Sequence, residues 1–403
     1  MTGITSTTLA SRLIRLQSFQ ETTWGTPGLA TARWMGVQPY PSFKPYQKST
    51  LFDEDRGSLQ NNFLSAVLVE GGEFTINMHA TYEEILFMLQ GGLQAVSPTG
   101  GPNYTWAYAA PTNAAWAAQS YTFEYGYDIG TIGASGCLIN KWSIKGGAKK
   151  QWEASIGGFF KTYYPNSAMS IASSTNASPI EITTADNHGL ETGMQVVIAS
   201  HATNTAANGT WTITKVSATK FTLTGSTGNG VGGATGTVTK AQTPAISDRT
   251  VEVILFPGTV LTMEASGGTL GTTTFANQLM NFSLEVDPGL EPIYGSDGKT
   301  PVAWTYAKMT PKLSLRLLHT AQAKAFVNTT LKAGQRAVCR LANTSGSKSA
   351  TLDFAGVLAE DISYYPNEQN AIAIDVKLEG QYEATSIANQ LKASIVNTVS
   401  ALP

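Results

Sequence analysis

The sequence predicts a mainly β protein with two similar lobes, each carrying one short helix, and a small all-β module inserted between them. Three observations lead to this prediction. Runs of alternating apolar and polar residues recur along the chain, only two helical patterns are convincing, and both follow a strand pattern at the same spacing. The lobes are placed at residues 1–169 and 244–403, and the inserted module at 170–243.

Alternation marks the expected strands. The run 74–79 puts its three apolar residues on one face, and 313–317 does the same with three leucines. The runs 211–216 and 221–224 repeat the pattern in the middle of the chain, and 371–378 is another long alternating run. This distribution predicts strands in both lobes and in the module between them.

Two segments carry helix signals. Thr81 to Glu84 forms a capping box, an apolar stripe follows it, and Gly91-Gly92 ends it. A second helix is expected to begin at Thr320 and to end before Gly334. The segment 10–17 fits either a short helix or a strand.

The two halves repeat one strand-then-helix unit. Phe74 and Leu313 are 239 residues apart, and so are the two capping residues Thr81 and Thr320. In each half a polar segment (39–62 or 287–301) separates an earlier strand from this unit and reads as a long loop. Two unrelated β domains could share a generic strand–helix pattern, but the constant spacing favours an internal duplication.

The segment from about Ser170 to Lys240 differs in composition from both lobes. It is rich in Thr, Gly, Asn and Ala, and Asn208-Gly209 is a turn signal between short strand patterns. It therefore reads as a small β module, with the flanks 170–178 and 239–243 as tethers.

Composition limits the kind of protein. Charged residues make up 13% of the chain, which is about half the usual roughly 25% of a soluble domain. A polar but weakly charged surface costs little to desolvate, so it suits a protein that buries its surface against copies of itself. The formal net charge is −2 and Lys149-Lys150 is the longest basic run. A protein that grips a duplex is therefore not expected, whereas one that lets DNA slide past remains open.

Compartment signals are few. Cys137 and Cys339 are the two cysteines, and we expect both to be buried thiols in a protein assembled in a reducing cytoplasm. Residues 1–10 lack the basic and apolar regions of a signal peptide. No apolar run approaches the roughly 20 residues of a membrane span, so no membrane is expected as a partner.

Catalytic patterns are not found, and we predict that the chain is not an enzyme and uses no cofactor or metal. None of the four histidines lies at metal-ligand spacing from another His or Cys. The segment Gly295 to Thr300 resembles the end of a P-loop, but the first glycine of that motif would fall at Ile293. The neighbouring carboxylates at 53–55 lie in a polar segment and read as an exposed or interface loop.

The stretch Glu21 to Thr26, E-T-T-W-G-T, resembles the opening of tail tube proteins of long-tailed bacteriophages. The order that follows is also similar: strand, long loop, strand ending in a capped helix, then a Gly-rich hairpin. Phe256 to Thr259 and Gly271 to Thr273 lead into the second lobe as that family's middle segment does. The inserted module, with Asn187 to Leu190 and Asn208 to Trp211, resembles the small β-barrel first named in ubiquitin-activating enzymes.

The resemblance implies β-sandwich lobes with a flanking helix, which stack as rings in the tail of a virion and conduct DNA to the host. Single-domain relatives form rings of six subunits, so a duplicated chain would build a pseudo-six-fold ring from three chains, with a hexamer as the alternative. The expected partners are copies of the chain, other tail proteins such as the tape measure and terminator, and double-stranded DNA that passes without specific binding. Assembly is expected in the host cytoplasm.

By the same resemblance, the segments 39–62 and 287–301 are the loops that contact the next ring. The candidate stacking residues are Tyr40, Phe43, Tyr46, Asp53, Glu54, Asp55, Arg56, Asp287, Glu291, Tyr294, Asp297 and Lys299.

Two other classes of function are weighed against the tube. A viral or cell-surface adhesin would use exposed aromatic side chains to stack on glycans, and buried aromatics in the insert would weaken that hypothesis. A hydrolase acting on the cell surface would need two carboxylates that converge in a groove, and the sequence offers no such pair.

Overall fold

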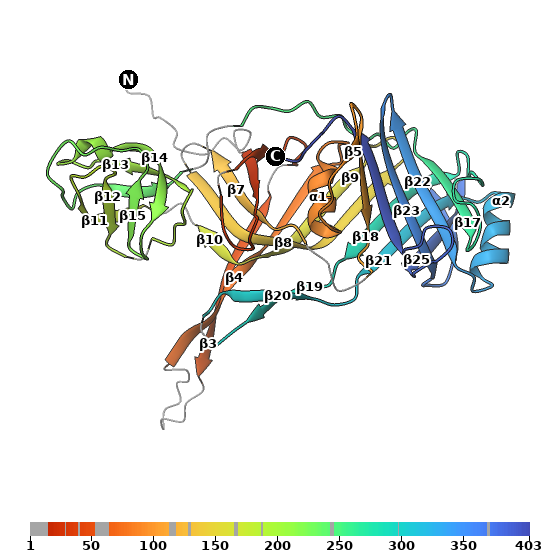
Figure 1. Ribbon diagram of the computed structural model, residues 1–403. Coiled ribbons are helices and arrows are strands. Elements are labelled where there is room, and N and C mark those ends of the chain that lie inside the picture. The colour runs from red at the N-terminus through yellow and green to blue at the C-terminus, as the bar shows by residue number, and fades with distance from the viewer. Residues whose placement is uncertain are drawn as a thin grey trace, which may run out of the picture.

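The computed structural model describes residues 15–28, 30–38, 41–52, 64–112, 118–127, 130–164, 168–186, 188–241, 246–296, 298–368 and 371–403. The protein is mainly β, with two short helices and a small closed barrel at one end (Figure 1). The predicted fold class is confirmed.

In the described residues, the first half has ten strands and one helix before the barrel. Their bounds are β1 Arg15–Gln20, β2 Ala32–Arg33, β3 Ser42–Phe52, β4 Leu64–His79, α1 Ile85–Gly92, β5 Thr99–Gly100, β6 Tyr104–Ala109, β7 Tyr121–Tyr127, β8 Gly130–Gly147, β9 Glu153–Phe160 and β10 Thr162–Tyr164. The segment 10–17, left open between helix and strand, enters β1 at Arg15.

The second half contains ten strands and one helix after the barrel. Their bounds are β17 Val260–Ala265, β18 Leu279–Asp287, β19 Leu290–Tyr294, β20 Pro301–Tyr306, β21 Thr310–Leu318, α2 Ala321–Phe326, β22 Ala337–Ser345, β23 Lys348–Leu358, β24 Ser363–Glu368, β25 Ala371–Gly380 and β26 Leu391–Asn397. Helix α2 continues directly into a π-helical turn, Val327–Leu331.

Both halves use the same strand order in one continuous sheet. In the first half β3 pairs with β4, β4 with β9 and β9 with β8. In the second half β18 pairs with β21, β21 with β25 and β25 with β24. Strand β8 also pairs with β18, so the eight strands run without a break from β3 to β24.

Further strands form a second group in each half. In the first half β2, β1, β7 and β10 extend from the first part of β8. In the second half β17, β22, β23 and β26 pair in that order, and β6 from the first half joins β26. Strands of the two halves therefore pair with each other at two places in the described sheet, β8–β18 and β6–β26.

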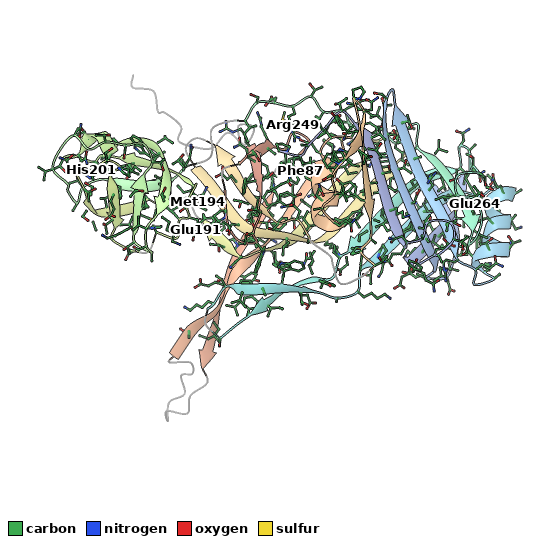
Figure 2. All side chains as sticks on the ribbon, in the orientation of Figure 1. Phe87, Glu191, Met194, His201, Arg249 and Glu264 are labelled. Carbon is green, nitrogen blue, oxygen red and sulfur yellow. The ribbon has the colours of Figure 1, made fainter. Side chains whose placement is uncertain are left out.

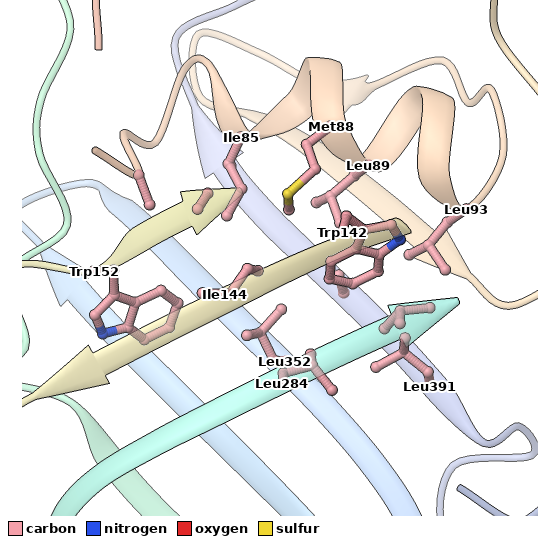
Figure 3. Packing of buried hydrophobic residues seen from close by; sticks show 14 of the residues in the cluster. Ile85, Met88, Leu89, Leu93, Trp142, Ile144, Trp152, Leu284, Leu352 and Leu391 are labelled. Carbon is pink, nitrogen blue, oxygen red and sulfur yellow. The ribbon is translucent and has the colours of Figure 1, made fainter. Parts of the chain in front are cut away.

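The core between these groups is shared by both halves. The alternating residues predicted on one face of β4 and β21 are buried: Phe74, Ile76, Met78, Leu313, Leu315 and Leu317. Figure 3 shows side chains of α1 lying over Trp142 and Ile144 of β8, beside Leu284 of β18 and Leu352 of β23. The cysteines are buried free thiols, as predicted, and burial raises the pKa of Cys339 to about 12.

Helix α2 begins as the sequence predicts, with Thr320 as its N-cap residue, whereas the start predicted for α1 is wrong: residues 82–84 form a turn, and α1 begins at Ile85 with Glu84 as its N-cap residue. The hydroxyl of Thr320 accepts a hydrogen bond from the N–H of Ala323, and the hydroxyl of Thr81 accepts one from the N–H of Glu84 at 3.0 Å. The Glu84 carboxylate does not make the second hydrogen bond of a capping box, which would come from the backbone N–H of Thr81. It accepts hydrogen bonds from the N–H groups of Met35 and Gly36 instead, and so ties the segment before β3 to α1.

The inserted module is a six-stranded closed barrel in the order β11-β12-β15-β14-β13-β16. Its bounds are β11 Met169–Ser174, β12 Glu181–Thr184, β13 Gln195–Ala199, a 3-10 turn Thr205–Ala207, β14 Gly209–Lys215, β15 Lys220–Leu223 and β16 Thr237–Lys240. The tethers predicted at 170–178 and 239–243 are wrong for 170–174 and 239–240, which are barrel strands.

A buried ion pair fixes the barrel to the first half. The Lys240 Nζ atom lies 3.1 Å from Glu124 Oε1 of β7, and the two side chains are 2% and 3% exposed. Tyr164 of β10 also belongs to the hydrophobic core of the barrel. The barrel is therefore packed onto the sheet rather than held by its flanks.

Candidate functional site

In their described residues, the polar segments predicted as stacking loops contain strands, and these strands belong to two neighbouring hairpins. Strand β3 and the first part of β4 form a long hairpin that projects from the body of the protein, and the β19–β20 hairpin runs toward it (Figure 1). We call these two hairpins the arm. The loop prediction is wrong for 42–52 and 290–294, because pairing with β4 and β20 makes these residues strands.

Specific contacts join the two hairpins of the arm. The hydroxyls of Tyr46 and Tyr294 are 3.0 Å apart, and the N–H of Glu70 donates to the carbonyl of Lys299 at 2.8 Å. The Lys299 ammonium is also 4.0 Å from the Glu70 carboxylate. Burial and the hydrogen bond with Tyr46 raise the pKa of Tyr294. The structure thus brings three of the predicted stacking residues, Tyr46, Tyr294 and Lys299, into one place.

The other predicted stacking residues have different surroundings. Phe43 packs at the base of the arm, with ring centroids 6.2 Å from both Phe74 and Phe123, so it extends the core. Asp287 ends β18 and accepts a hydrogen bond from the N–H of Gly289, while Glu291 is exposed on β19. Outside the described residues lie Tyr40, Asp53, Glu54, Asp55, Arg56 and Asp297.

Sequence reasoning missed apolar side chains on the arm. The exposed fractions are 59% for Leu51, 52% for Leu68, 42% for Ile293 and 46% for Val302. Several exposed apolar side chains on a projecting pair of hairpins suit a contact surface. The signal in the sequence was weak, because Leu51 and Ile293 are isolated in segments that read as polar overall, and Leu68 and Val302 lie outside those segments.

The motif that carries the family resemblance has a structural role. The Glu21 carboxylate is 5% exposed and accepts four hydrogen bonds, from the N–H groups of Gly25 and Gly136 and the hydroxyls of Ser120 and Thr122, at 2.8 to 2.9 Å. Trp24 donates its indole N–H to the carbonyl of Gly136. Burial raises the pKa of Glu21, and the hydrogen bonds oppose that rise. The motif joins the end of β1 to β7 and β8.

The histidines of the barrel act as internal hydrogen-bonding groups. His188 Nδ1 accepts from the N–H of Leu190, and its Nε2 lies 3.0 Å from the carbonyl of Ser217. His201, labelled in Figure 2, accepts from the N–H of Asn204 at Nδ1 and contacts the Ser174 hydroxyl through Nε2. Burial lowers the pKa of both rings. Within the described ranges, no three His, Cys, Asp or Glu side chains are placed to share a metal ion.

Aromatic side chains in the barrel face its core. Phe221 is fully buried, and Trp211 is half-buried with its indole N–H donated to the carbonyl of Ala207. These are the two aromatic residues in the module. Phe221 thus meets the condition that would weaken the adhesin hypothesis, whereas the half-buried Trp211 does not.

No helix in the described ranges is both long and apolar enough to cross a membrane. A comparison of the chain with known protein families found no match, and a search of curated proteins found no similar sequence.

Proposed function

We propose that the chain is a structural tail tube protein, in which three chains join edge to edge into a ring and the rings stack into a tube that conducts DNA from virion to host. One observation carries this proposal. The two terminal strands of the eight-stranded sheet, β3 and β24, are the counterparts of two strands that already pair inside the chain, β18 and β8.

The registers define these counterparts. Phe43 lies opposite Phe74 in β3–β4, as Leu284 lies opposite Leu313 in β18–β21. Ser363 lies opposite Asp375 in β24–β25, as Ser143 lies opposite Ser155 in β8–β9. A neighbouring chain could therefore place its β3 beside β24, as β18 lies beside β8 within one chain.

Closing the sheet in this way gives a barrel with an open channel. Three chains of eight strands supply 24 strands, and a spacing of about 4.8 Å with a tilt of about 40° gives a diameter of roughly 50 Å. Barrels of about 16 to 18 strands already enclose water. The ring also converts two strand edges, which otherwise promote aggregation, into specific contacts.

Both terminal strands carry features that limit uncontrolled pairing. Pro45 lies in β3 and Pro366 in β24, and each strand has a register shift against its partner. A proline removes an N–H donor from the ladder. The contact between chains would thus be confined to short matching stretches, including Ser42–Lys44 and Ser363–Tyr364.

The two helices differ in a way that supports the same contact. Helix α1 is wholly buried, and the second half covers the turn before it: Tyr82 donates its hydroxyl to Asn343, and Asn397 donates to the carbonyl of Tyr82, both at 2.6 Å. Its counterpart α2 has one buried residue, Ala323. In a ring, the neighbouring chain would cover α2 as the second half covers α1.

A disulfide experiment tests the contact. In one chain Ser143 pairs with Glu285 across β8–β18, and the corresponding positions across two chains are Ser363 and Lys44. Directly opposed residues have Cβ atoms about 4.5–5.5 Å apart, close to what a disulfide needs. The double variant Ser363→Cys/Lys44→Cys should form covalent trimers on mild oxidation, as measured by non-reducing electrophoresis.

The matched control is Ser143→Cys/Glu285→Cys, which should form its disulfide within one chain and stay monomeric on the gel. If the control cross-links but the Ser363→Cys/Lys44→Cys variant stays uncross-linked at every protein concentration, the proposed edge contact is wrong.

A further inference from the structure

The eight-stranded sheet has one face on the core and one polar face. We use "polar face" for the side chains that point away from the core in the body of the sheet, from β3 to β25. Alternation along β8 shows the division: Trp142 and Ile144 are buried, whereas Lys141 and Lys145 are exposed. The polar face is continuous across the junction between the two halves, because β8 pairs with β18.

Acidic and basic side chains are balanced on the described part of this face. Six are basic and six are acidic: Lys44, Lys141, Lys145, Lys312, Arg316 and Lys377, and Glu73, Glu153, Glu285, Asp287, Asp375 and Glu379. Their formal charges cancel.

The strand registers set opposite charges against each other. Among the described pairings, no two like charges on this face are directly opposed. The opposed charged pairs are Lys44–Glu73, Lys145–Glu153, Glu285–Lys312, Lys312–Glu379 and Arg316–Asp375. The result is a surface on which each of these cations has a carboxylate as its neighbour.

One of these opposed pairs and one diagonal neighbour pair are formed as ion pairs. Arg316 and Asp375 make a two-pronged pair with N–O distances of 2.7 and 2.8 Å. Lys145 lies 3.6 Å from Glu285 across the β8–β18 junction. A DNA phosphate that approached these cations would have to displace a carboxylate already in place.

DNA is held without sequence preference when free Lys and Arg side chains neutralise phosphates and release counterions. We propose that the polar face is a charge-compensated surface that does not retain double-stranded DNA, and that its carboxylates prevent retention. The choice of DNA as the polyanion rests on the proposed function. The observation that the charges compensate each other is independent of that function.

Opposite charges across strands also stabilise a sheet. The pairing alone therefore does not distinguish a role in sheet stability from a role in preventing DNA retention. The barrel provides a matched comparison. It carries surface ion pairs of the same kind, Lys215–Glu191 at 2.6 Å and Lys220–Glu181 at 2.9 Å, away from the polar face.

The experiment compares two full-length triple variants with equal charge changes. The polar-face variant is Glu153→Gln/Glu285→Gln/Asp375→Asn, and the barrel variant is Glu181→Gln/Glu191→Gln/Asp186→Asn. Binding of unassembled protein to a mixed-sequence duplex of about 30 base pairs is measured by fluorescence anisotropy at about 50 mM salt, where phosphate contacts are strong. Thermal melting is recorded for every variant.

The polar-face variant should bind at least about tenfold more tightly than the parent and the barrel variant. Two cations, Lys145 and Arg316, lose their opposed carboxylates in this variant, so that affinity should fall by roughly twelvefold between about 50 and 200 mM salt. Equal binding by both variants, or no binding by a folded polar-face variant, overturns the proposal.

A charge swap, Arg316→Asp/Asp375→Arg, keeps the pair and the net charge, so it should leave DNA binding at the level of the parent. The charge swap also tests the proposal if the polar-face triple variant does not fold. Tight DNA binding by the charge-swap variant would contradict the claim that paired opposite charges prevent DNA retention. Ring formation is scored separately by electron microscopy. If no rings form but the polar-face variant binds DNA as expected, the tube proposal is rejected. The proposal of charge compensation is then still supported.

Discussion

At the scale of single residues, buried carboxylates hold distant segments together. Glu21 gathers donors from three segments, and Glu84 binds the backbone before β3 while Arg249 approaches it at 3.4 Å. Arg249 also lies 5.2 Å from the ring centroid of Phe87, beside which it is drawn in Figure 2. The sequence indicated Glu21 and Glu84 as parts of motifs, but the partners of their carboxylates are too far away in the chain to be read from it.

Replacing Glu21 by glutamine should destabilise the protein. The amide keeps the size of the side chain but replaces one acceptor oxygen with a donor, which faces N–H and hydroxyl donors. We expect a loss of about 1–3 kcal/mol in the free energy of unfolding, measured with denaturant. The exposed Glu291→Gln is the control and should be neutral. A loss no larger than that of the control would contradict the role of Glu21.

Acid should loosen the barrel. The lowered pKa values of His188 and His201 mean that the folded barrel favours neutral rings, whose Nδ1 atoms accept backbone hydrogen bonds. An unfolded histidine titrates near about 6.5, so this stabilisation is complete above that pH and is lost as the pH falls through the lowered folded values. Hydrogen-exchange protection factors of residues 168–241 should therefore drop between pH 7.5 and pH 5.

The double variant His188→Gln/His201→Gln removes both titrating rings and should show a flatter pH dependence over the same range. Protection factors that do not change with pH in the parent protein would reject this explanation.

At the scale of elements, alternation and capping predicted those whose pattern is local. The strands around Phe74 and Leu313 and the start of α2 are where the sequence places them, whereas α1 begins at Ile85, after a turn that Thr81 opens. Strand β3 was missed because its sequence, with Pro45 and Lys48, has no regular alternation, and its long partner β4 supplies the pairing. The tether at Ser170 was misplaced because polar Ser/Thr residues form a strand when a barrel closes around them.

The attachment of the barrel provides an element-scale prediction. Lys240→Met leaves the buried Glu124 carboxylate without the ammonium of its partner, so the variant should lose about 3–5 kcal/mol in stability. Adding Glu124→Gln removes the buried charge, so the double variant should be more stable than the single one in denaturant unfolding. If the double variant is as unstable as Lys240→Met, the loss of stability in the single variant does not come from the remaining buried charge.

The same pair affects removal of the barrel. Deleting residues 171–241 removes Lys240, so the deletion should be combined with Glu124→Gln, which removes the buried carboxylate that Lys240 contacts. If the barrel is displayed outside the ring, this shortened chain should still form tubes under the electron microscope. Loss of polymerisation in a folded shortened chain would place the barrel in the contact between subunits.

At the scale of the whole molecule, the constant spacing of 239 residues indicated a repeat, and the structure shows what it produces. The two halves do not fold as separate sheets: β8–β18 and β6–β26 make them one body. No local pattern could reveal these pairings, because their strands are far apart in the chain and each would fit any edge of suitable register. The fold class was therefore predictable, whereas the arm and the junction were not.

The symmetry of the assembled protein tests the central claim most directly. Cryo-electron microscopy of the purified full-length chain at high concentration should show stacked rings of three chains, each ring with pseudo-six-fold symmetry and with β24 of one chain beside β3 of the next. A chain that remains monomeric under all conditions, or rings in which β3 and β24 face away from the neighbouring subunit, would contradict it.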